Sequence, residues 1–293
     1  MTSFVAPPDF SKNFEIEKDI QDHDFAFFQK LILSIAGISL SEKKRDLLRT
    51  RLGPYIRNNN FTNYSAYRKH LESLPENHDE WQKLINLMTT NKTDFFREVA
   101  HFEYIESTLI PLWIKAGKKE VHIWSAASSS GEEPYTLAIF LANKLPKGMN
   151  FKILASDIDT NILNKAKNGV YSISKECEIP ETYRSRSIDY GTDNIKDWFR
   201  IKKHLKDHVT FEIHNLIDDS FPSDKLFDLI LCRNVMIYFP KNVVEEVANK
   251  LFNACLPEGY LFIGHSESLQ ATRTPWVTTA PSIYKKTNSL KRK

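Results

Sequence analysis

The sequence has few cysteines, few glycines and no long apolar run. Its three cysteines, Cys177, Cys232 and Cys255, lie far apart and form no CxxC pair. This pattern favours a reducing cytoplasm over a disulfide framework. No stretch of 18 apolar residues occurs, so no membrane-spanning helix or direct membrane insertion is expected. The N-terminal residues lack a basic start followed by an apolar core, which argues against a secretory signal. A cytoplasmic location is therefore expected.

Charge of one sign does not dominate either. The 40 Lys and Arg residues nearly balance 37 Asp and Glu residues, which argues against a protein that coats nucleic acid. Residues 42–57 are a local exception, with six basic side chains against two acidic ones. Three interpretations of this segment are open: a solvated helix face, a phosphate-binding face, and a docking face for an acidic partner. The segment lacks neighbouring aromatic pairs for base stacking, and Gly53-Pro54 predicts that its helix kinks or ends there.

The length of 293 residues suggests about two domains. Residues 1–24 are polar and are expected to form a flexible arm, and helical spacing of apolar residues predicts a helical domain over 25–100. Strands then alternate with helices over 101–293, which predicts a mostly parallel sheet with helices on both faces. Residues 173–208 interrupt this rhythm and are predicted to be an insertion. The predicted strands are 121–126, 151–157, 209–215, 227–234, 260–266 and 282–286, with helices from Glu132 and over 241–254.

The loop after the first strand, residues 125–131, is made of small residues. Gly131 is its only glycine, so the G-x-G-x-x-G dinucleotide fingerprint is absent. Glu132 and Glu133 follow, and they would repel a pyrophosphate but suit a ligand with a positive amino group and a sulfonium. A capping box from Ser130 to Glu133 is the structural alternative.

Asp157 ends the second predicted strand. A carboxylate at that point can accept hydrogen bonds from both hydroxyls of a ribose. The alternative role is an N-cap for the next helix, and Asp159 competes for it. His204 and His208 are four residues apart, but no third ligand is in view and there is no HExxH motif. No metal is therefore expected.

Several long motifs resemble those of the chemotaxis receptor glutamate methyltransferases, the CheR family, and occur in the family's order. They span some 180 residues, and the helical part is similar as well. The family fold implied is a helical N-terminal domain followed by a Rossmann-like, seven-stranded methyltransferase domain with a small antiparallel β insertion. The motifs are TTNKTDFFRE (89–98), WSAASSSGEEPY (124–135), ASDIDTNIL (155–163), FDLILCRNVMIYF (227–239) and GHSESL (264–269).

The resemblance also implies the roles of particular residues. It places Glu133 near the methionyl amino group of S-adenosylmethionine, Asp157 at the ribose, and Asn215-Leu216 beside the adenine. Arg97 and Tyr238 are the implied catalytic residues, with Tyr238 directed towards the transferred methyl. The full implied cofactor set is Asn91, Thr93, Arg97, Glu133, Asp157, Asn215, Leu216, Arg233 and Asn234.

The implied activity is protein-glutamate O-methylation, in which S-adenosylmethionine gives a glutamate methyl ester and S-adenosylhomocysteine. The implied partners are the cytoplasmic domains of methyl-accepting chemotaxis receptors, with Arg51 and Arg57 as docking residues and no nucleic acid. Some family members use the insertion to grip a peptide at the receptor C-terminus. The alternatives are a methyltransferase acting on another substrate and a cofactor-binding module without activity.

Overall fold

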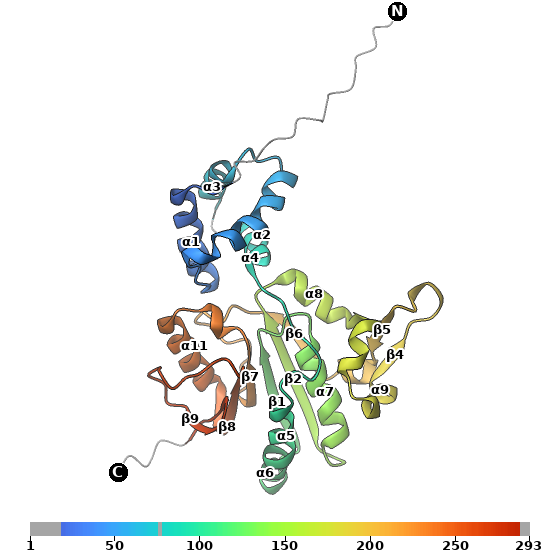
Figure 1. Cartoon of the computed structure of the whole chain (residues 1–293). Coiled ribbons are helices and arrows are strands. Elements are labelled where there is room, and N and C mark those ends of the chain that lie inside the picture. Colours follow the sequence, from blue (N-terminus) through green and yellow to red (C-terminus); the bar gives the residue numbers. More distant parts are fainter. Residues whose placement is uncertain (1–18, 76–77, 288–293) are drawn as a thin grey trace, which may run out of the picture. The chain divides into compact units, whose positions relative to one another are not determined.

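The computed structural model describes residues 19–75 and 78–287, and it divides into two compact units (Figure 1). The first contains the described residues up to Ser34 together with Leu40–Met88. The second contains Ile35–Ser39 and the chain from Thr89 onwards. No helix in the described part of the chain is long and apolar enough to cross a membrane.

The first unit is entirely helical. Its helices are α1 (Asp22–Ala36, whose last two residues belong to the second unit), η1 (Glu42–Lys44), α2 (Arg45–Asn58), α3 (Tyr64–Glu72) and α4 (Asp79–Met88). Aromatic side chains fill its centre, where the rings of Phe28 and Tyr67 stack with centroids 6.0 Å apart. Asn63 begins α3 by accepting a hydrogen bond from the backbone N–H of Ala66.

Helix α2 runs through Pro54 to Asn58, so of the two predicted outcomes at Gly53-Pro54, a kink or an end, the end is wrong. A proline ring clashes with the Cβ atom of a preceding helical residue. Gly53 has no Cβ atom and so avoids this clash. A Cβ atom at position 53 would also lie only 3.2 Å from the Tyr64 hydroxyl. The glycine therefore lets the proline remain within the helix.

The second unit is built on a seven-stranded sheet with the order β6-β2-β1-β7-β8-β10-β9 (Figure 1). Strand β10 is antiparallel to β8 and β9, and the pairs from β6 to β8 are parallel. The mostly parallel sheet predicted from the sequence is confirmed, and β9 is the strand that was not predicted. The strands are β1 (Glu120–Ala126), β2 (Asn150–Asp157), β6 (Val209–Ile213), β7 (Phe227–Cys232), β8 (Cys255–Ile263), β9 (Val277–Ala280) and β10 (Ile283–Lys285).

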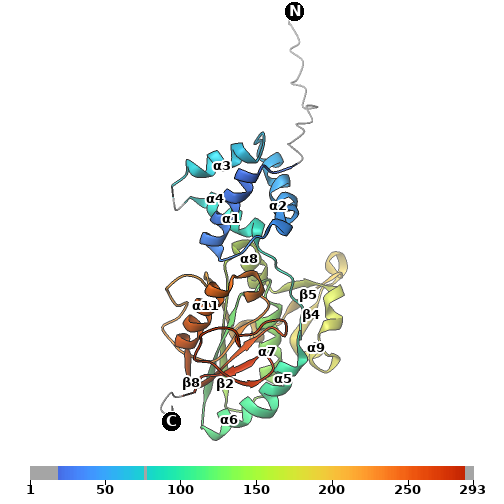
Figure 2. The ribbon, with the colours of Figure 1, turned by 60° about the vertical axis from the view of Figure 1, so that its left-hand side comes forward.

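Helices cover both faces of this sheet (Figure 2). On one face, α5 (Val99–Tyr104), η2 (Ile105–Leu109), α6 (Ile110–Lys115) and α7 (Glu132–Lys144) bury residues such as Leu109 and Leu137 against the strands. On the other face, α11 (Lys241–Ala254) buries Val247 and Leu251. Each face thus has its own apolar core.

Where the sequence predicted an insertion over 173–208, the structure has a three-stranded antiparallel sheet with the order β3-β5-β4, whose first strand begins earlier, at Val170. It follows α8 (Thr160–Asn168) and precedes β6. Lys175 of the insertion lies 2.9 Å from the buried Glu132 carboxylate at the start of α7, which ties the insertion to the main sheet layer. Its elements are β3 (Val170–Ser172), η3 (Ile173–Glu178), α9 (Glu181–Ser187), β4 (Ile188–Tyr190), η4 (Asp193–Ile195), β5 (Trp198–Ile201) and α10 (Lys203–Lys206).

The strand order reverses beside β1. The chain runs from β1 outwards to β2 and β6, then returns to β7 on the other side of β1. The loops that leave β1 and β7 therefore turn in opposite directions, which opens a crevice beyond their carboxyl ends.

Candidate active site

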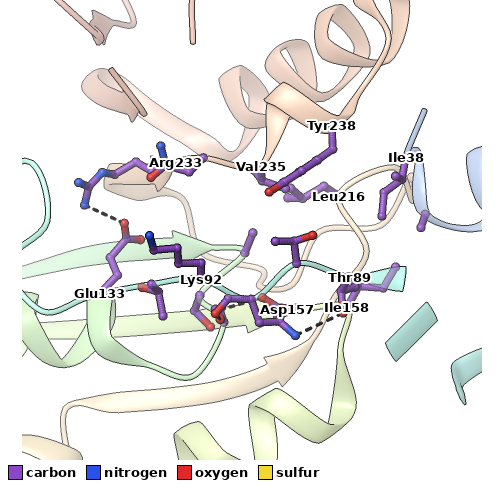
Figure 3. Close-up of a pocket in the computed structure, with 18 of the residues that line it drawn as sticks. Ile38, Thr89, Lys92, Glu133, Asp157, Ile158, Leu216, Arg233, Val235 and Tyr238 are labelled. Atoms are coloured by element: carbon purple, nitrogen blue, oxygen red, sulfur yellow. Dashed lines mark hydrogen bonds and ion pairs between the residues drawn. The ribbon is translucent and has the colours of Figure 1, made fainter. Parts of the chain in front are cut away.

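A pocket occupies this crevice and encloses about 930 Å³ of space, part of it open to solvent (Figure 3). All ten residues that the sequence resemblance assigned to catalysis or cofactor binding line it. These come from segments far apart in the chain, brought together by the strand reversal. They are Asn91, Thr93, Arg97, Glu133, Asp157, Asn215, Leu216, Arg233, Asn234 and Tyr238.

The loop after β1 bends sharply. Ala127, Ser129 and Gly131 all have positive φ angles, of 61°, 50° and 94°. Gly131 is the N-cap of α7, and a Cβ atom there would lie 3.0 Å from both the Ala166 Cβ atom and the Tyr171 hydroxyl. A side chain at this position would therefore be strained and crowded.

The capping box suggested by the sequence does not form. The Ser130 hydroxyl donates to Glu132, and Gly131 is the residue that begins the helix. Glu133 instead accepts a hydrogen bond of 2.7 Å from the Ser125 hydroxyl. Its carboxylate therefore faces the end of β1, inside the pocket.

Asp157 is 6% exposed at the end of β2. Its Oδ2 accepts the backbone N–H of Ser129 at 2.8 Å, and its Oδ1 accepts that of Asp159 at 2.9 Å. Burial raises the pKa of Asp157 to about 6, although these N–H groups act in the opposite direction. The backbone N–H of Ile158 acts in the same direction, and these three donors leave at least one of the carboxylate's four lone-pair sites for another donor.

Asp159 has the N-cap role that competed for Asp157. Its Oδ1 accepts the N–H groups of Asn161 and Ile162 at the start of α8. Its Oδ2 accepts from Thr89 at 2.7 Å and from Asn91 at 2.8 Å. Asn91 thus joins the segment before α5 to the loop after β2, and Asp157 is left free of helix capping.

Arg233, just after β7, connects three parts of the site. Its Nη1 lies 3.0 Å from the Glu133 carboxylate, drawn as a dashed line in Figure 3. Its Nε donates to Glu98 at 3.1 Å, and its Nη2 donates to the Arg97 carbonyl. Burial acts to raise the pKa of Glu98, but Arg233 and the His265 N–H outweigh it and leave that pKa below its usual value.

Two residues of this framework, Glu98 and Glu267, were not identified from the sequence. Glu98 has a φ of 61° and also accepts the Asn234 side-chain amide at 3.4 Å. Glu267 is 9% exposed and accepts the N–H groups of Asn234, Gly264 and Ile237. Their roles depend on loop turns that a sequence pattern does not specify, although both lie inside the quoted motifs.

Apolar side chains form another part of the pocket. Ile158 follows Asp157, and Leu216 lies across the pocket from it in Figure 3. Ile38 lies beside Leu216 in the same view. Asn215 donates through its amide to the Ile35 carbonyl at 2.9 Å, which holds these two segments together. A flat aromatic base fits between such apolar walls.

The two candidate catalytic residues enter the pocket from different segments. Arg97 precedes α5, and its Nη1 lies 3.3 Å from the Lys92 carbonyl. Tyr238 ends η5 (Met236–Tyr238), and its carbonyl accepts the N–H of Ser39 at 2.8 Å. Thr93 also lines the pocket, and its carbonyl accepts from Lys175 of the insertion at 2.8 Å.

The two candidate docking residues lie in the helical unit and differ in environment. Arg51 is half-buried and donates to the Met88 carbonyl at 2.6 Å, at the end of α4. Arg57 is exposed. Arg51 therefore has a structural contact that the charge pattern did not reveal.

The pocket fits S-adenosylmethionine in chemistry. A carboxylate is available for an amino group at Glu133, a second carboxylate with spare lone pairs for ribose hydroxyls at Asp157, and apolar walls for a base. No pyrophosphate-binding glycine loop is present in the described chain. The fold and the site thus define a Rossmann-like domain built for an adenosine cofactor that carries positive charge.

Comparison with known proteins identifies the family. Residues 91–284 match the family model described as the CheR methyltransferase SAM-binding domain, and residues 23–89 match the CheR methyltransferase all-alpha domain. The chain belongs to the CheR methyltransferase family and is an S-adenosylmethionine-dependent methyltransferase.

Three relatives, each named chemotaxis protein methyltransferase, are similar over most of their length. The protein of Borreliella burgdorferi is 36% identical over 94% of this chain and 97% of its own. That of Salmonella typhimurium is 37% identical over 85% of both chains. That of Escherichia coli is 35% identical over 90% of this chain and 91% of its own. The family predicted from the sequence motifs is confirmed.

Proposed function

We propose that this protein transfers the methyl group of S-adenosylmethionine to glutamate side chains of chemotaxis receptors. The observation that carries the proposal is that Arg97 and Tyr238 line the same pocket as Glu133 and Asp157. Groups able to orient a carboxylate thus lie beside groups suited to hold the methyl donor. The names of the relatives support a role in chemotaxis.

A carboxylate acceptor does not require a strong general base in the site. A glutamate with a pKa of about 4.3 is ionised at neutral pH and needs no proton removed before it attacks. The cofactor supplies an electrophilic methyl group on a sulfonium. The work left to the protein is orientation, which can contribute roughly 7–11 kcal/mol to the rate.

Arg97 is the proposed group for this orientation. Its planar guanidinium donates in a rigid fork and can hold one oxygen of the acceptor while the other attacks. Tyr238 offers a hydroxyl that can donate to the acceptor carboxylate and aim it. Partial exclusion of water from the pocket favours the joining of an anion and a cation into neutral products.

The framework around Arg233 keeps these groups in place. Arg233 neutralises part of the charge of Glu133 while Glu98 holds the guanidinium from the other side. Its bond to the Arg97 carbonyl fixes the backbone from which the Arg97 side chain extends. We assign Arg233 and Asn234 to the cofactor side of the pocket and Glu98 to their positioning.

The proposed partners are the glutamate-rich cytoplasmic domains of the receptors, and the proposed location of this protein is the cytoplasm. The basic residue Arg57 of α2 is exposed and suits an acidic helix. Nucleic acid and membrane insertion have no role in this proposal.

The test is incubation of the protein with S-adenosylmethionine labelled in its methyl group and membranes that contain chemotaxis receptors. We expect label on the receptor that mild base releases as methanol, which is the behaviour of a methyl ester. Label that resists base would indicate transfer to nitrogen or sulfur. Absence of label, with cofactor binding intact, would indicate a binding module or another substrate.

A further inference from the structure

A cluster of three side chains able to bind a metal, Glu98, His101 and His265, lies outside the pocket lining. Glu98 is the N-cap of α5 and His101 lies in its first turn, with Glu98 Oε2 3.5 Å from His101 Nδ1. His265 follows the end of β8 and approaches the same carboxylate. One ligand atom from each residue lies within 4.8 Å of the other two.

His101 is the unexplained member of this cluster. It is 1% exposed, and neither of its ring nitrogens has a hydrogen-bond partner among the described residues. Buried polar atoms normally have a partner, and a neutral imidazole offers one donor and one acceptor. Its Nδ1 points to the Glu98 carboxylate at 3.5 Å, beyond ordinary bonding length for such a donor.

We propose that Glu98, His101 and His265 bind a divalent transition-metal ion of the zinc type. Two imidazoles and one carboxylate are a known ligand set for Zn²⁺, whereas Mg²⁺ and Ca²⁺ prefer oxygen ligands. Bonds of about 2.1 Å in a tetrahedron place ligand atoms about 3.4 Å apart. The distances from Glu98 Oε2 to His101 Nδ1 and His265 Nε2 are 3.5 and 3.9 Å.

Two changes would complete the arrangement: rotation of the His265 ring, and loss of one of the two Arg233 contacts that Glu98 Oε2 now accepts. His265 is 48% exposed at its side chain, so its ring can turn towards His101 without repacking the core. The ring centroids of the two histidines are already 5.1 Å apart. The exposed side of His265 also leaves an entry path and a fourth position for water.

Charge sets a limit on the affinity. Arg233 lies 3.1 Å from the same Glu98 oxygen and opposes a second cation, while Glu133 partly neutralises Arg233. Weaker binding than at a dedicated structural zinc site is therefore expected. None of the three proposed ligands lines the cofactor pocket, but Glu98 contacts Arg233, which does. Since Glu98 also holds Arg233, an ion there provides a way to modulate cofactor affinity.

The experiment is calorimetric titration of the tag-free, chelator-treated protein with Zn²⁺ alone, followed by Co²⁺ absorption spectroscopy. One ion per chain and visible absorption typical of tetrahedral Co²⁺ are expected. His265→Ala should weaken Zn²⁺ binding by a factor on the order of 10–100 or more, because loss of a ligand exceeds loss of an outer partner. Its backbone N–H, which donates to Glu98, remains in this variant.

Matched controls are His204→Ala, which removes another exposed imidazole, and Cys177→Ser, which removes the exposed thiol. Both should bind Zn²⁺ like the wild type. His101→Phe, which keeps an aromatic ring against Phe262, should lose binding while thermal unfolding reports whether it is folded. Wild-type Zn²⁺ affinity in His265→Ala, or no binding by the wild-type protein, would overturn the proposal.

Discussion

The guanidinium of Arg233 lies 3.0 Å from the carboxylate of Glu133, although 100 residues separate them in the chain. One residue follows β7 and the other lies in the first turn of α7. The ion pair therefore links the segments that follow β1 and β7, the two strands beside which the sheet order reverses. Part of the charge of Glu133 is thereby balanced in the absence of the cofactor amino group proposed to bind it.

Glu133→Ala is expected to weaken binding of S-adenosylhomocysteine by about 1.5–3 kcal/mol, the usual cost of losing a charged hydrogen-bond partner. The variant also leaves Arg233 facing the position proposed for the amino group. Calorimetry measures the effect, with Glu212→Ala as control because Glu212 is exposed on β6 outside the pocket. Equal affinity of both variants and the wild type for S-adenosylhomocysteine would contradict a role for Glu133 in cofactor binding.

Asp157→Ala should weaken the same ligand by a similar 1.5–3 kcal/mol. In the wild type, affinity should also fall as pH drops below about 6, because protonation of Asp157 removes the charged acceptor proposed for the ribose hydroxyls. At pH 5 a tenfold loss is expected, about 1.4 kcal/mol. Asp157→Asn should bind weakly at every pH from 5 to 8. A wild-type affinity that stays constant over this range would contradict the proposed contact.

The same pKa has a consequence for stability. The folded pKa of about 6 exceeds the ordinary value of about 3.9, so the folded state binds this proton more tightly. The resulting stabilisation is present below about pH 4 and is lost as pH rises to about 6. From pH 7 to 4, the wild type should gain up to about 3 kcal/mol relative to Asp157→Asn in urea unfolding. A constant difference between the two would argue against the raised pKa.

The two candidate docking residues of α2, Arg51 and Arg57, are expected to differ, with Arg57 acting on receptor docking and Arg51 on stability. Arg57→Glu should reduce receptor methylation at physiological salt without changing cofactor affinity, and the difference should fade as salt rises. Lys147→Glu, the same charge change at an exposed position after α7, is the control. Turnover of Arg57→Glu equal to this control across a salt series would exclude a docking role.

Arg51→Glu is expected to act on stability instead. Its side chain donates to the Met88 carbonyl at the end of α4, and a carboxylate there would repel that oxygen. Thermal unfolding should show a lower midpoint for Arg51→Glu than for Arg57→Glu. Equal unfolding midpoints for Arg51→Glu and Arg57→Glu would contradict a structural role for Arg51 and favour the docking role predicted from the sequence.

Much of the sheet was predictable because its strands and helices carry strong patterns. Helix α11 spans the predicted residues 241–254, and β7 is fully buried and apolar apart from Asp228. Strand β9 was missed because its segment VTTA has no alternation and is mostly exposed. Its pairing with β10 comes from the fold and not from its own residues.

The site was predictable from long motifs but not from local pattern alone. Asp157 and Glu133 follow strands, so strand prediction places them at the sheet edge. The position of the Glu98 side chain depends on a left-handed backbone turn that the sequence pattern does not reveal. His265, whose ring lies beside that of His101, is more than 160 residues away in the chain. In the helical unit, the sequence suggested that Pro54 could end α2, but the missing Cβ atom of Gly53 lets the proline stay inside the helix.

The orientation of the acceptor by Arg97 is the central claim, and single-turnover methyl transfer to receptor membranes at saturating cofactor tests it most directly. Arg97→Ala should lose most of the rate, Arg97→Lys should also be poor because lysine lacks the planar fork, and Tyr238→Phe should lose part. Wild-type rates should stay level between about pH 6 and 8, where glutamate is ionised. A wild-type rate in Arg97→Ala, or a steep pH dependence that disappears in Tyr238→Phe, would contradict orientation of an ionised carboxylate as the basis of the reaction.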